Sequence, residues 1–137
     1  MRRMHVLMVV LALVAGVTAA GQETVCRGDV QTVAEGFEFT EGPAWHPDGF
    51  IIFSDIPANT IYRLTAEGEK KVYRHPSGQS NGLEFDAQGR LVACEHGNRR
   101  VSVTRGGEPE TLVDSYRGKR LNSPNDLVIR SDGTIYF

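Results

Sequence analysis

The sequence lacks an excess of charge of either sign, which excludes several kinds of partner. Its 137 residues contain 15 lysines and arginines against 17 aspartates and glutamates. Proteins that bind nucleic acid or an anionic membrane surface usually gather their basic residues in a run or on one face. The pair Arg99-Arg100 is too short for this and is typical of a solvated strand edge. We therefore expect neither a nucleic acid nor a membrane as a partner of the mature protein.

Cysteine is scarce too, because Cys26 and Cys94 are the only two. Two cysteines do not make the disulfide framework of a small secreted domain, and their spacing is not that of a zinc site. A bridge between them is compatible with an oxidising compartment. However, Cys94 ends the apolar run 91–94, which is more typical of a small buried side chain. The sequence leaves both states open.

The sequence has one long hydrophobic run, residues 6–17, and this run is too short to span a bilayer, which needs about 20 apolar residues. Two arginines precede the run and small residues follow it, as in a secretory signal peptide. A buried N-terminal helix or strand is the alternative. We predict that residues 1–20 are a signal peptide and that the mature domain begins near residue 21. The protein is then exported, either to the periplasm or out of the cell.

No stretch after the leader has the 3.6-residue apolar period of a helix, whereas one hairpin pattern occurs three times. Residues 41–53, 81–93 and 125–137 align without gaps, at offsets of 40 and 44 residues. Each segment has a short strand, a turn that ends in glycine and an apolar second strand. The turn glycine supplies the positive φ that a tight hairpin needs.

Further strand-like segments lie between these repeats, at 60–64, 70–73, 100–104 and 110–113. About four strands per 40–44 residues is the period of a β-propeller blade. The predicted class is therefore all-β, with about two propeller blades and the start of a third. An open β-sandwich is the alternative. Because a ring needs at least four blades to hide its edge strands, we expect residues 21–137 to be the N-terminal portion of an incomplete propeller domain.

The repeat puts a polar residue at the same position before each inner strand: Glu41, Asn81 and Asn125. The innermost strand of a blade runs beside the central channel, so equivalent positions form a ring around its axis. One carboxylate and two amide carbonyls are oxygen donors of the kind that bind a hard cation such as Ca²⁺. The alternative is that the asparagines only cap turns.

A second set of residues follows from the geometry of the hairpins. Asp55 and its repeat partner Glu95 end the returning strand, so we expect them on the same face as Glu41 and Asn81. His96 follows directly and could orient a substrate or carry a proton, because imidazole titrates near neutral pH. A solvated loop histidine is the alternative. The sequence has no Ser-His-Asp order, nucleotide-binding loop or zinc helix motif.

Several motifs resemble those of the gluconolactonase/regucalcin (senescence marker protein) family, especially its exported bacterial members. They are EGPAW at 41–45, SNGL at 80–83, CEHGNRR at 94–100 and NSPNDL at 122–127. The resemblance covers residues 30–137. It implies a six-bladed propeller with a divalent cation, usually Ca²⁺, in the central channel. It also implies a hydrolase that opens a small lactone, its small-molecule substrate.

The same resemblance implies roles for single residues. Glu41 matches the family's metal-binding glutamate, and Asn125 matches an asparagine near the metal that contacts the substrate. We group Asn81 and Ser123 with Asn125 as substrate-binding candidates. Ser123 stands where regucalcin-type members carry an arginine for the sugar lactone, which leaves the identity of the lactone open. A further metal-binding asparagine and the aspartate that serves as general base are expected beyond Phe137.

Two other classes of protein fit the same pattern. One is a non-catalytic propeller that binds a ligand or partner and uses the cation only structurally. The other is a strictosidine-synthase-like propeller, which shares the architecture but has different channel residues. A downstream aspartate that points to the axis would favour the hydrolase, and its absence would favour the binding module.

Overall fold

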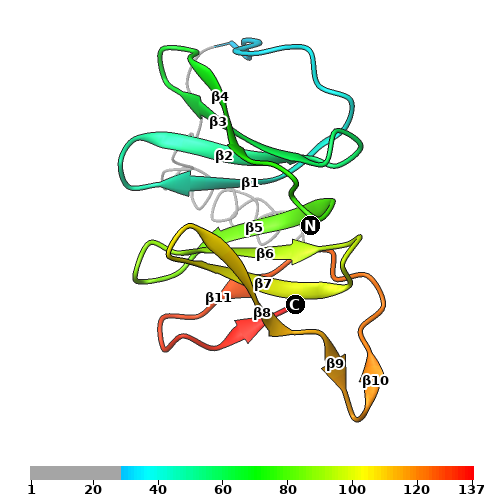
Figure 1. Ribbon diagram of the computed structural model, residues 1–137. Coiled ribbons are helices and arrows are strands. Elements are labelled where there is room, and N and C mark those ends of the chain that lie inside the picture. Colours follow the sequence, from blue (N-terminus) through cyan, green and yellow to red (C-terminus); the bar gives the residue numbers. More distant parts are fainter. Residues whose placement is uncertain (1–28) are drawn as a thin grey trace, which may run out of the picture. The chain divides into compact units, whose positions relative to one another are not determined.

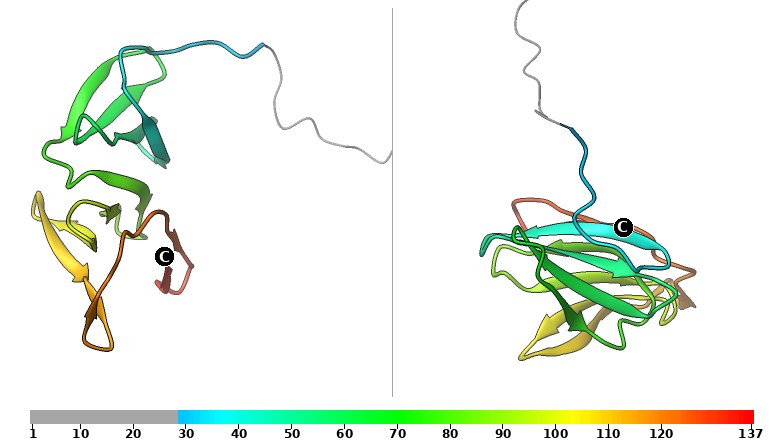
Figure 2. Two further views of the ribbon diagram at one scale, coloured as in Figure 1. Left: turned by 90° about the vertical axis from the view of Figure 1, so that its right-hand side faces the viewer. Right: turned by 90° about the horizontal axis from the view of Figure 1, so that it is seen from above.

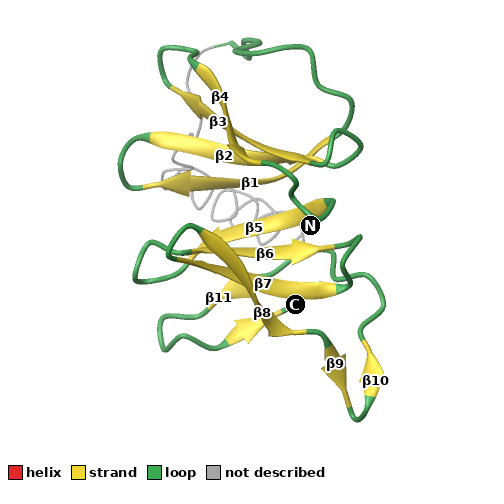
Figure 3. Cartoon of the chain, viewed as in Figure 1, coloured by secondary structure: helices red, strands yellow, loops and turns green. Residues whose placement is uncertain are grey.

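The computed structural model describes residues 29–137, so the predicted signal peptide and Cys26 lie outside this part. Within it, Thr32–Phe137 form one compact unit. The regular structure of this unit consists of strands joined by turns (Figure 3). None of the described residues forms a helix long and apolar enough to cross a membrane.

Eight strands form two antiparallel four-stranded sheets, in each of which the strands follow one another in sequence order (Figure 1). The first sheet, blade 1, contains β1 (Thr40–His46), β2 (Phe50–Asp55), β3 (Thr60–Thr65) and β4 (Lys70–Arg74). The second sheet, blade 2, contains β5 (Ser80–Phe85), β6 (Leu91–Glu95), β7 (Arg100–Arg105) and β8 (Glu108–Val113). The predicted four strands per repeat are therefore confirmed.

Two short hairpins complete the chain. The first, β9 (Ser115–Tyr116) with β10 (Lys119–Arg120), projects beyond blade 2 (Figure 1). The second, β11 (Val128–Ile129) with β12 (Ile135–Tyr136), is the third repeat. Strand β5 contacts both β1 and β11, and these first strands lie toward the same side in the left view of Figure 2. This is the arrangement of successive propeller blades around an axis.

Glycines close the predicted hairpin turns. Gly49, Gly89 and Gly133 have φ values of 87°, 72° and 86°. Each donates its N–H to the carbonyl three residues earlier, at 2.8–2.9 Å. Residues with a Cβ are strained at these angles. The turn chemistry that the repeat indicates is therefore the chemistry that the structure uses.

Strand β6 is buried along its whole length because both of its faces meet other sheets. Its alternating side chains feed two apolar clusters, since successive residues of a strand point to opposite faces. Leu91 and Ala93 pack between blades 1 and 2, whereas Val92 and Cys94 pack toward Leu127 of the third repeat. Cys94 has a free thiol with no exposed surface, and burial raises its pKa to about 12. It is a core residue, as its apolar run indicates.

Candidate active site

The inner strands of successive repeats begin in direct backbone contact. Gly82 donates its N–H to the carbonyl of Asn125 at 2.7 Å, and Gly42 lies against the carbonyl of Asn81. A Cβ on either glycine would overlap the neighbouring segment of the next repeat. The ladder register shifts at the same places in β1 and β5, as in β-bulges that re-aim side chains. The glycines after Glu41 and Asn81 therefore allow the inner strands of successive repeats to approach closely.

A polar cavity of about 290 Å³ lies where these segments meet. It is lined by Glu41, Gly42, Pro43, Asn81, Leu83, Glu84, Asn125, Asp126 and Leu127. The structure thus brings together Glu41, Asn81 and Asn125, the three residues that the repeat predicts at one depth. The Asn81 amide nitrogen donates to the Asn125 amide oxygen at 2.5 Å. What these side chains bind is still a prediction.

Sequence reasoning missed two carboxylates of this cavity, Glu84 and Asp126. Asp126 stands where the first two repeats have Gly42 and Gly82, and this departure from the repeat was a signal that could have found it. Glu84 carries no comparable signal, because acidic residues are common at solvated strand positions. Both add negative charge beside Glu41 and thus favour a cationic occupant.

The predicted second set, Asp55 and Glu95, reaches the expected end of the blades but does not line the cavity. Asp55 lies opposite Thr40 and Glu95 lies opposite Ser80. Directly paired residues share a face, and each of these partners is one residue before the cavity residue. Asp55 instead accepts the backbone N–H groups of residues 38 and 39, at 3.0 and 3.1 Å. The expectation that Asp55 and Glu95 share a face with the cavity residues is therefore wrong.

Glu95 is the centre of a buried ionic cluster that joins the two blades. It is 1% exposed and pairs with Arg100 at 2.7 Å and with Arg74 of blade 1 at 3.2 Å. Burial raises the pKa of Glu95, but the hydrogen bonds from its neighbours, among them Arg100 and Asn98, together with the charge of Arg74 outweigh burial and hold this pKa below its ordinary value. Burial in turn lowers the pKa of Arg74, against the pull of Glu95.

The prediction that Arg99 and Arg100 form a solvated strand edge is wrong. Arg100 belongs to the ionic cluster, and Arg99 donates to the carbonyls of Leu121 and Asn122 at 2.7 and 2.9 Å. The sequence could not reveal the partners of Arg99, because these acceptors lie more than 20 residues away and are backbone atoms.

His96 and Ser123 meet beside the entry to the third repeat. The His96 ring nitrogen Nδ1 is in hydrogen-bond contact with the Ser123 hydroxyl. His96 is exposed and Ser123 is half-buried, and neither lines the polar cavity. Ser123 precedes Asn125 by two residues in the sequence, but the pair is not part of the lining of the candidate site.

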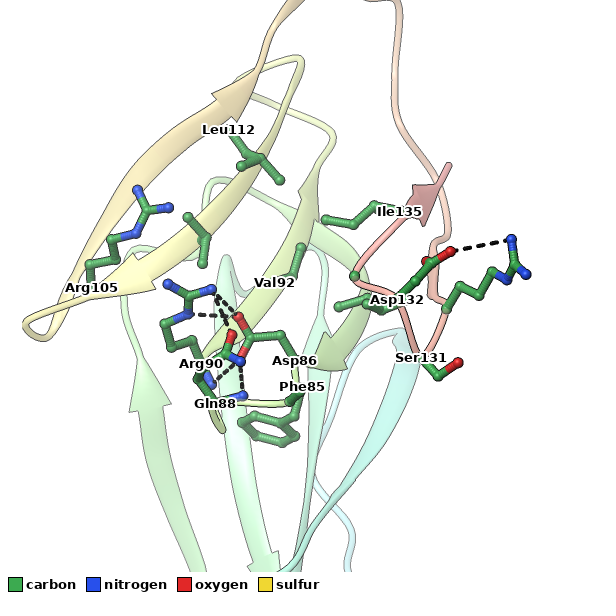
Figure 4. A pocket seen from close by; sticks show the side chains of 15 residues that line it. Phe85, Asp86, Gln88, Arg90, Val92, Arg105, Leu112, Ser131, Asp132 and Ile135 are labelled. Carbon is green, nitrogen blue, oxygen red and sulfur yellow. Dashed lines mark hydrogen bonds and ion pairs between the residues drawn. The ribbon is translucent and has the colours of Figure 1, made fainter.

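A larger cavity of about 410 Å³ lies between blade 2 and the third repeat (Figure 4). Its polar side is formed by the turns 86–90 and 130–133, with ion pairs Asp86–Arg90 at 2.6 Å and Arg130–Asp132 at 3.3 Å. Val92, Leu112 and Ile135 line the apolar side. These turns are at the opposite ends of the hairpin strands from Asn81 and Asn125, so this cavity is separate from the candidate site.

Residues 39–137, which hold every strand of the structure, match the model of the SMP-30/gluconolactonase/LRE-like region. The chain belongs to this family. The family resemblance expected from the motifs is thereby confirmed, as is the all-β propeller class.

One curated protein and two solved structures illustrate how similar the chain is to known proteins in sequence and in fold. A gluconolactonase of Zymomonas mobilis is 32% identical over 126 residues, which cover 79% of this chain and 35% of that protein. The solved gluconolactonase of Xanthomonas campestris is 38% identical, with a TM-score of 0.73 over 76% of this chain and 36% of its own. Virginiamycin B lyase of Staphylococcus aureus has a TM-score of 0.57 and 23% identity over 72% of this chain and 33% of its own, and shares the fold alone.

The chain spans about a third of the length of these relatives. Its polar cavity contains residues of two blades and of the third repeat. In the described residues 29–137, no three histidine, cysteine, aspartate or glutamate side chains gather as a metal site. Any cation at this cavity would therefore need amide oxygens or ligands from outside these residues in addition to Glu41.

Proposed function

We propose that this SMP-30/gluconolactonase protein hydrolyses a small lactone with the help of a divalent cation, of which Ca²⁺ fits best. The observation that carries the proposal is the convergence of Glu41, Asn81 and Asn125 on one polar cavity beside the inner strands. Two gluconolactonases among the relatives support the reaction class.

The donor set supports a hard cation. Ca²⁺ prefers six to eight oxygen ligands, including carboxylates and amide carbonyls. Glu41 supplies a carboxylate, and Glu84 and Asp126 add negative charge around it. Since the Asn81 amide nitrogen already donates to Asn125, the carbonyl oxygen is the end of the Asn81 side chain that is left for a cation or substrate. When bound, the cation would polarise the carbonyl of the lactone.

The residues of this chain would divide the remaining tasks. Glu41 would hold the cation through its charge, and the Asn125 amide would bind and orient the lactone. Asn81 would fix the Asn125 side chain through their mutual hydrogen bond. Ser123 and His96, which do not line the cavity, would contact polar groups of the lactone outside it. The general base that activates water is expected from another part of the protein, as an aspartate.

Replacement of a single charge tests this proposal. Glu41→Gln keeps the shape of the side chain but removes the charge, so Ca²⁺ affinity measured by calorimetric titration should fall strongly. Lactone hydrolysis, followed by acid release, should fall with it and recover partly at high Ca²⁺. Asn125→Ala should instead lower turnover even at saturating Ca²⁺. Glu69→Gln, at an exposed ion pair with Lys71, is the matched control and should change neither. Parent-like binding and hydrolysis by Glu41→Gln would refute the proposed site.

We also propose that residues 1–20 direct export and are then removed, because their charge and apolar pattern is that of a signal peptide. Sequencing the N-terminus of protein recovered outside the cytoplasm tests this. Retention of Met1 on exported protein would rule it out.

A further inference from the structure

Two turns at equivalent positions of the repeat have the same unusual backbone. One ends at Asn59 after β2, and the other ends at Arg99 after β6. The two residues are 40 positions apart, the offset of the first two repeats. Their φ values of 52° and 57° lie in the left-handed region, which few non-glycine residues adopt. Such backbone strain persists where the surroundings fix it, and it is often found at functional sites.

The side chain of Asn59 holds the segment that leads into blade 2. Its Oδ1 accepts the N–H groups of Ser77 at 3.1 Å and of Gln79 at 2.8 Å. The Asn59 carbonyl accepts the Ser77 N–H as well, at 2.8 Å. Two residues after Gln79, the chain reaches Asn81 at the polar cavity. Asn59 therefore fixes the approach of Asn81.

The side chain of Arg99 does the same for the segment that leads into the third repeat. Its Nε donates to the carbonyls of Leu121 and Asn122, at 2.7 and 2.9 Å. Three residues later the chain reaches Asn125. The polarity is reversed relative to Asn59, because this segment presents carbonyls instead of N–H groups. The two repeat positions thus perform one task with opposite hydrogen-bond chemistry.

We propose that Asn59 and Arg99 are positioning residues that set the places of Asn81 and Asn125 at the polar cavity. The effect of this positioning on catalysis rests on the proposed function. The two asparagines bond to each other, and the Asn125 carbonyl also accepts the Gly82 N–H. A shift of either incoming segment would therefore move both amides. Small misplacements of groups that orient a substrate lower the rate strongly.

We call the hydrogen bonds from Arg99 to Leu121 and Asn122 the clamp. The Gly82 N–H reports directly on the clamp, because its acceptor is the carbonyl of Asn125. Under native conditions, Arg99→Ala should speed hydrogen exchange at the Gly82 amide roughly tenfold or more relative to the parent protein. Amides in the centre of β6 should keep their protection. Arg99→Lys, which offers a point donor in place of the guanidinium, should give an intermediate rate. The control is Arg105→Ala, at the far end of β7, where the arginine forms an exposed ion pair with Glu110; it should leave exchange at Gly82 unchanged.

Kinetics provide the second arm. Arg99→Ala should lower kcat/KM for lactone hydrolysis by roughly 10- to 100-fold at saturating Ca²⁺, with Arg99→Lys between it and the parent. Unchanged Gly82 exchange in both variants, or faster exchange spread evenly over β5 and β6, would overturn the positioning role. If the protein hydrolyses no lactone, the proposed function fails, but the exchange measurement still decides whether Arg99 sets the place of Asn125.

Discussion

Blades 1 and 2 use different chemistry at equivalent positions to reach the same geometry. At the end of the second strand, Asp55 of blade 1 accepts two backbone N–H groups of the segment that enters β1. Its counterpart Glu95 is surrounded by arginines of both blades. Asp55 thus ties the segment that enters β1 to blade 1, whereas Glu95 links blade 2 to the last strand of blade 1. Equivalent positions of the repeat therefore hold buried carboxylates that have different partners and different roles.

The segments between blades differ in the same way. Six residues, 75–80, lead from β4 to Asn81, whereas eleven residues, 114–124, lead from β8 to Asn125. The longer segment contains the β9–β10 hairpin, closed at its base by the bond from the Leu121 N–H to the Asp114 carbonyl. Both segments nevertheless deliver an asparagine to the polar cavity. The hydrogen bonds of Asn59 and Arg99 fix where these segments end, so the length of the segments is free to vary.

The comparison of the two carboxylates predicts the largest difference in stability. Glu95→Gln leaves Arg74 and Arg100 without their buried counter-ion, which should cost roughly 3–5 kcal/mol in the free energy of unfolding. Asp55→Asn keeps one acceptor oxygen for its neutral backbone donors and should cost only about 1 kcal/mol. Urea unfolding of the native protein and both variants measures the difference. Equal losses would contradict the different roles assigned to the two carboxylates.

The pH dependence of stability sharpens this prediction. Because the folded pKa of Glu95 lies below its ordinary value of 4.5, its contribution is complete above the unfolded pKa and is lost as the pH falls through the folded pKa. The gap in unfolding free energy between the parent and Glu95→Gln should therefore be widest near neutral pH and shrink below pH 4.5. A gap that stays constant down to the acid limit would mean that the charge of Glu95 is not what stabilises the blades.

The glycines provide a second comparison, between contacts that join blades and turns within a blade. Gly42→Ala combines a φ of 56° with overlap of the Asn81 carbonyl, so strain and overpacking together should cost roughly 2–4 kcal/mol. At Gly89 the φ is 72°, but nothing lies within 4 Å of the added Cβ, so Gly89→Ala should cost about 1 kcal/mol. Thermal unfolding of the two variants checks this order. The reverse order would show that the blade contact yields easily.

The repeat predicted the strands, their turns and the convergence of three polar residues, because these follow from local periodicity. Every expected strand between the repeats was found within a few residues of its predicted place. The partners of Glu95 and Arg99 could not be predicted in this way. They depend on side chains and carbonyls from other elements, and a shift of one residue in register decides which face a side chain occupies. Asp126 shows that departures from a repeat are as informative as the repeat itself.

The smallest expected effect concerns the two connecting segments. Replacing residues 115–120 by two glycines would shorten the second connection toward the length of the first and remove the β9–β10 hairpin. The change in loop-closure free energy with length is small, about 0.6 kcal/mol per doubling. Of the contacts to blade 2, the bond from Arg120 to the Asn98 carbonyl would be lost, whereas the two bonds from Arg99 to Leu121 and Asn122 remain. We therefore expect the unfolding free energy to fall by about 1 kcal/mol or less, with Gly82 still protected from hydrogen exchange.

Combining the deletion with Arg99→Ala should then expose Gly82 as strongly as Arg99→Ala alone. If the deletion by itself removes the protection of Gly82, the hairpin, and not the clamp, sets the place of Asn125.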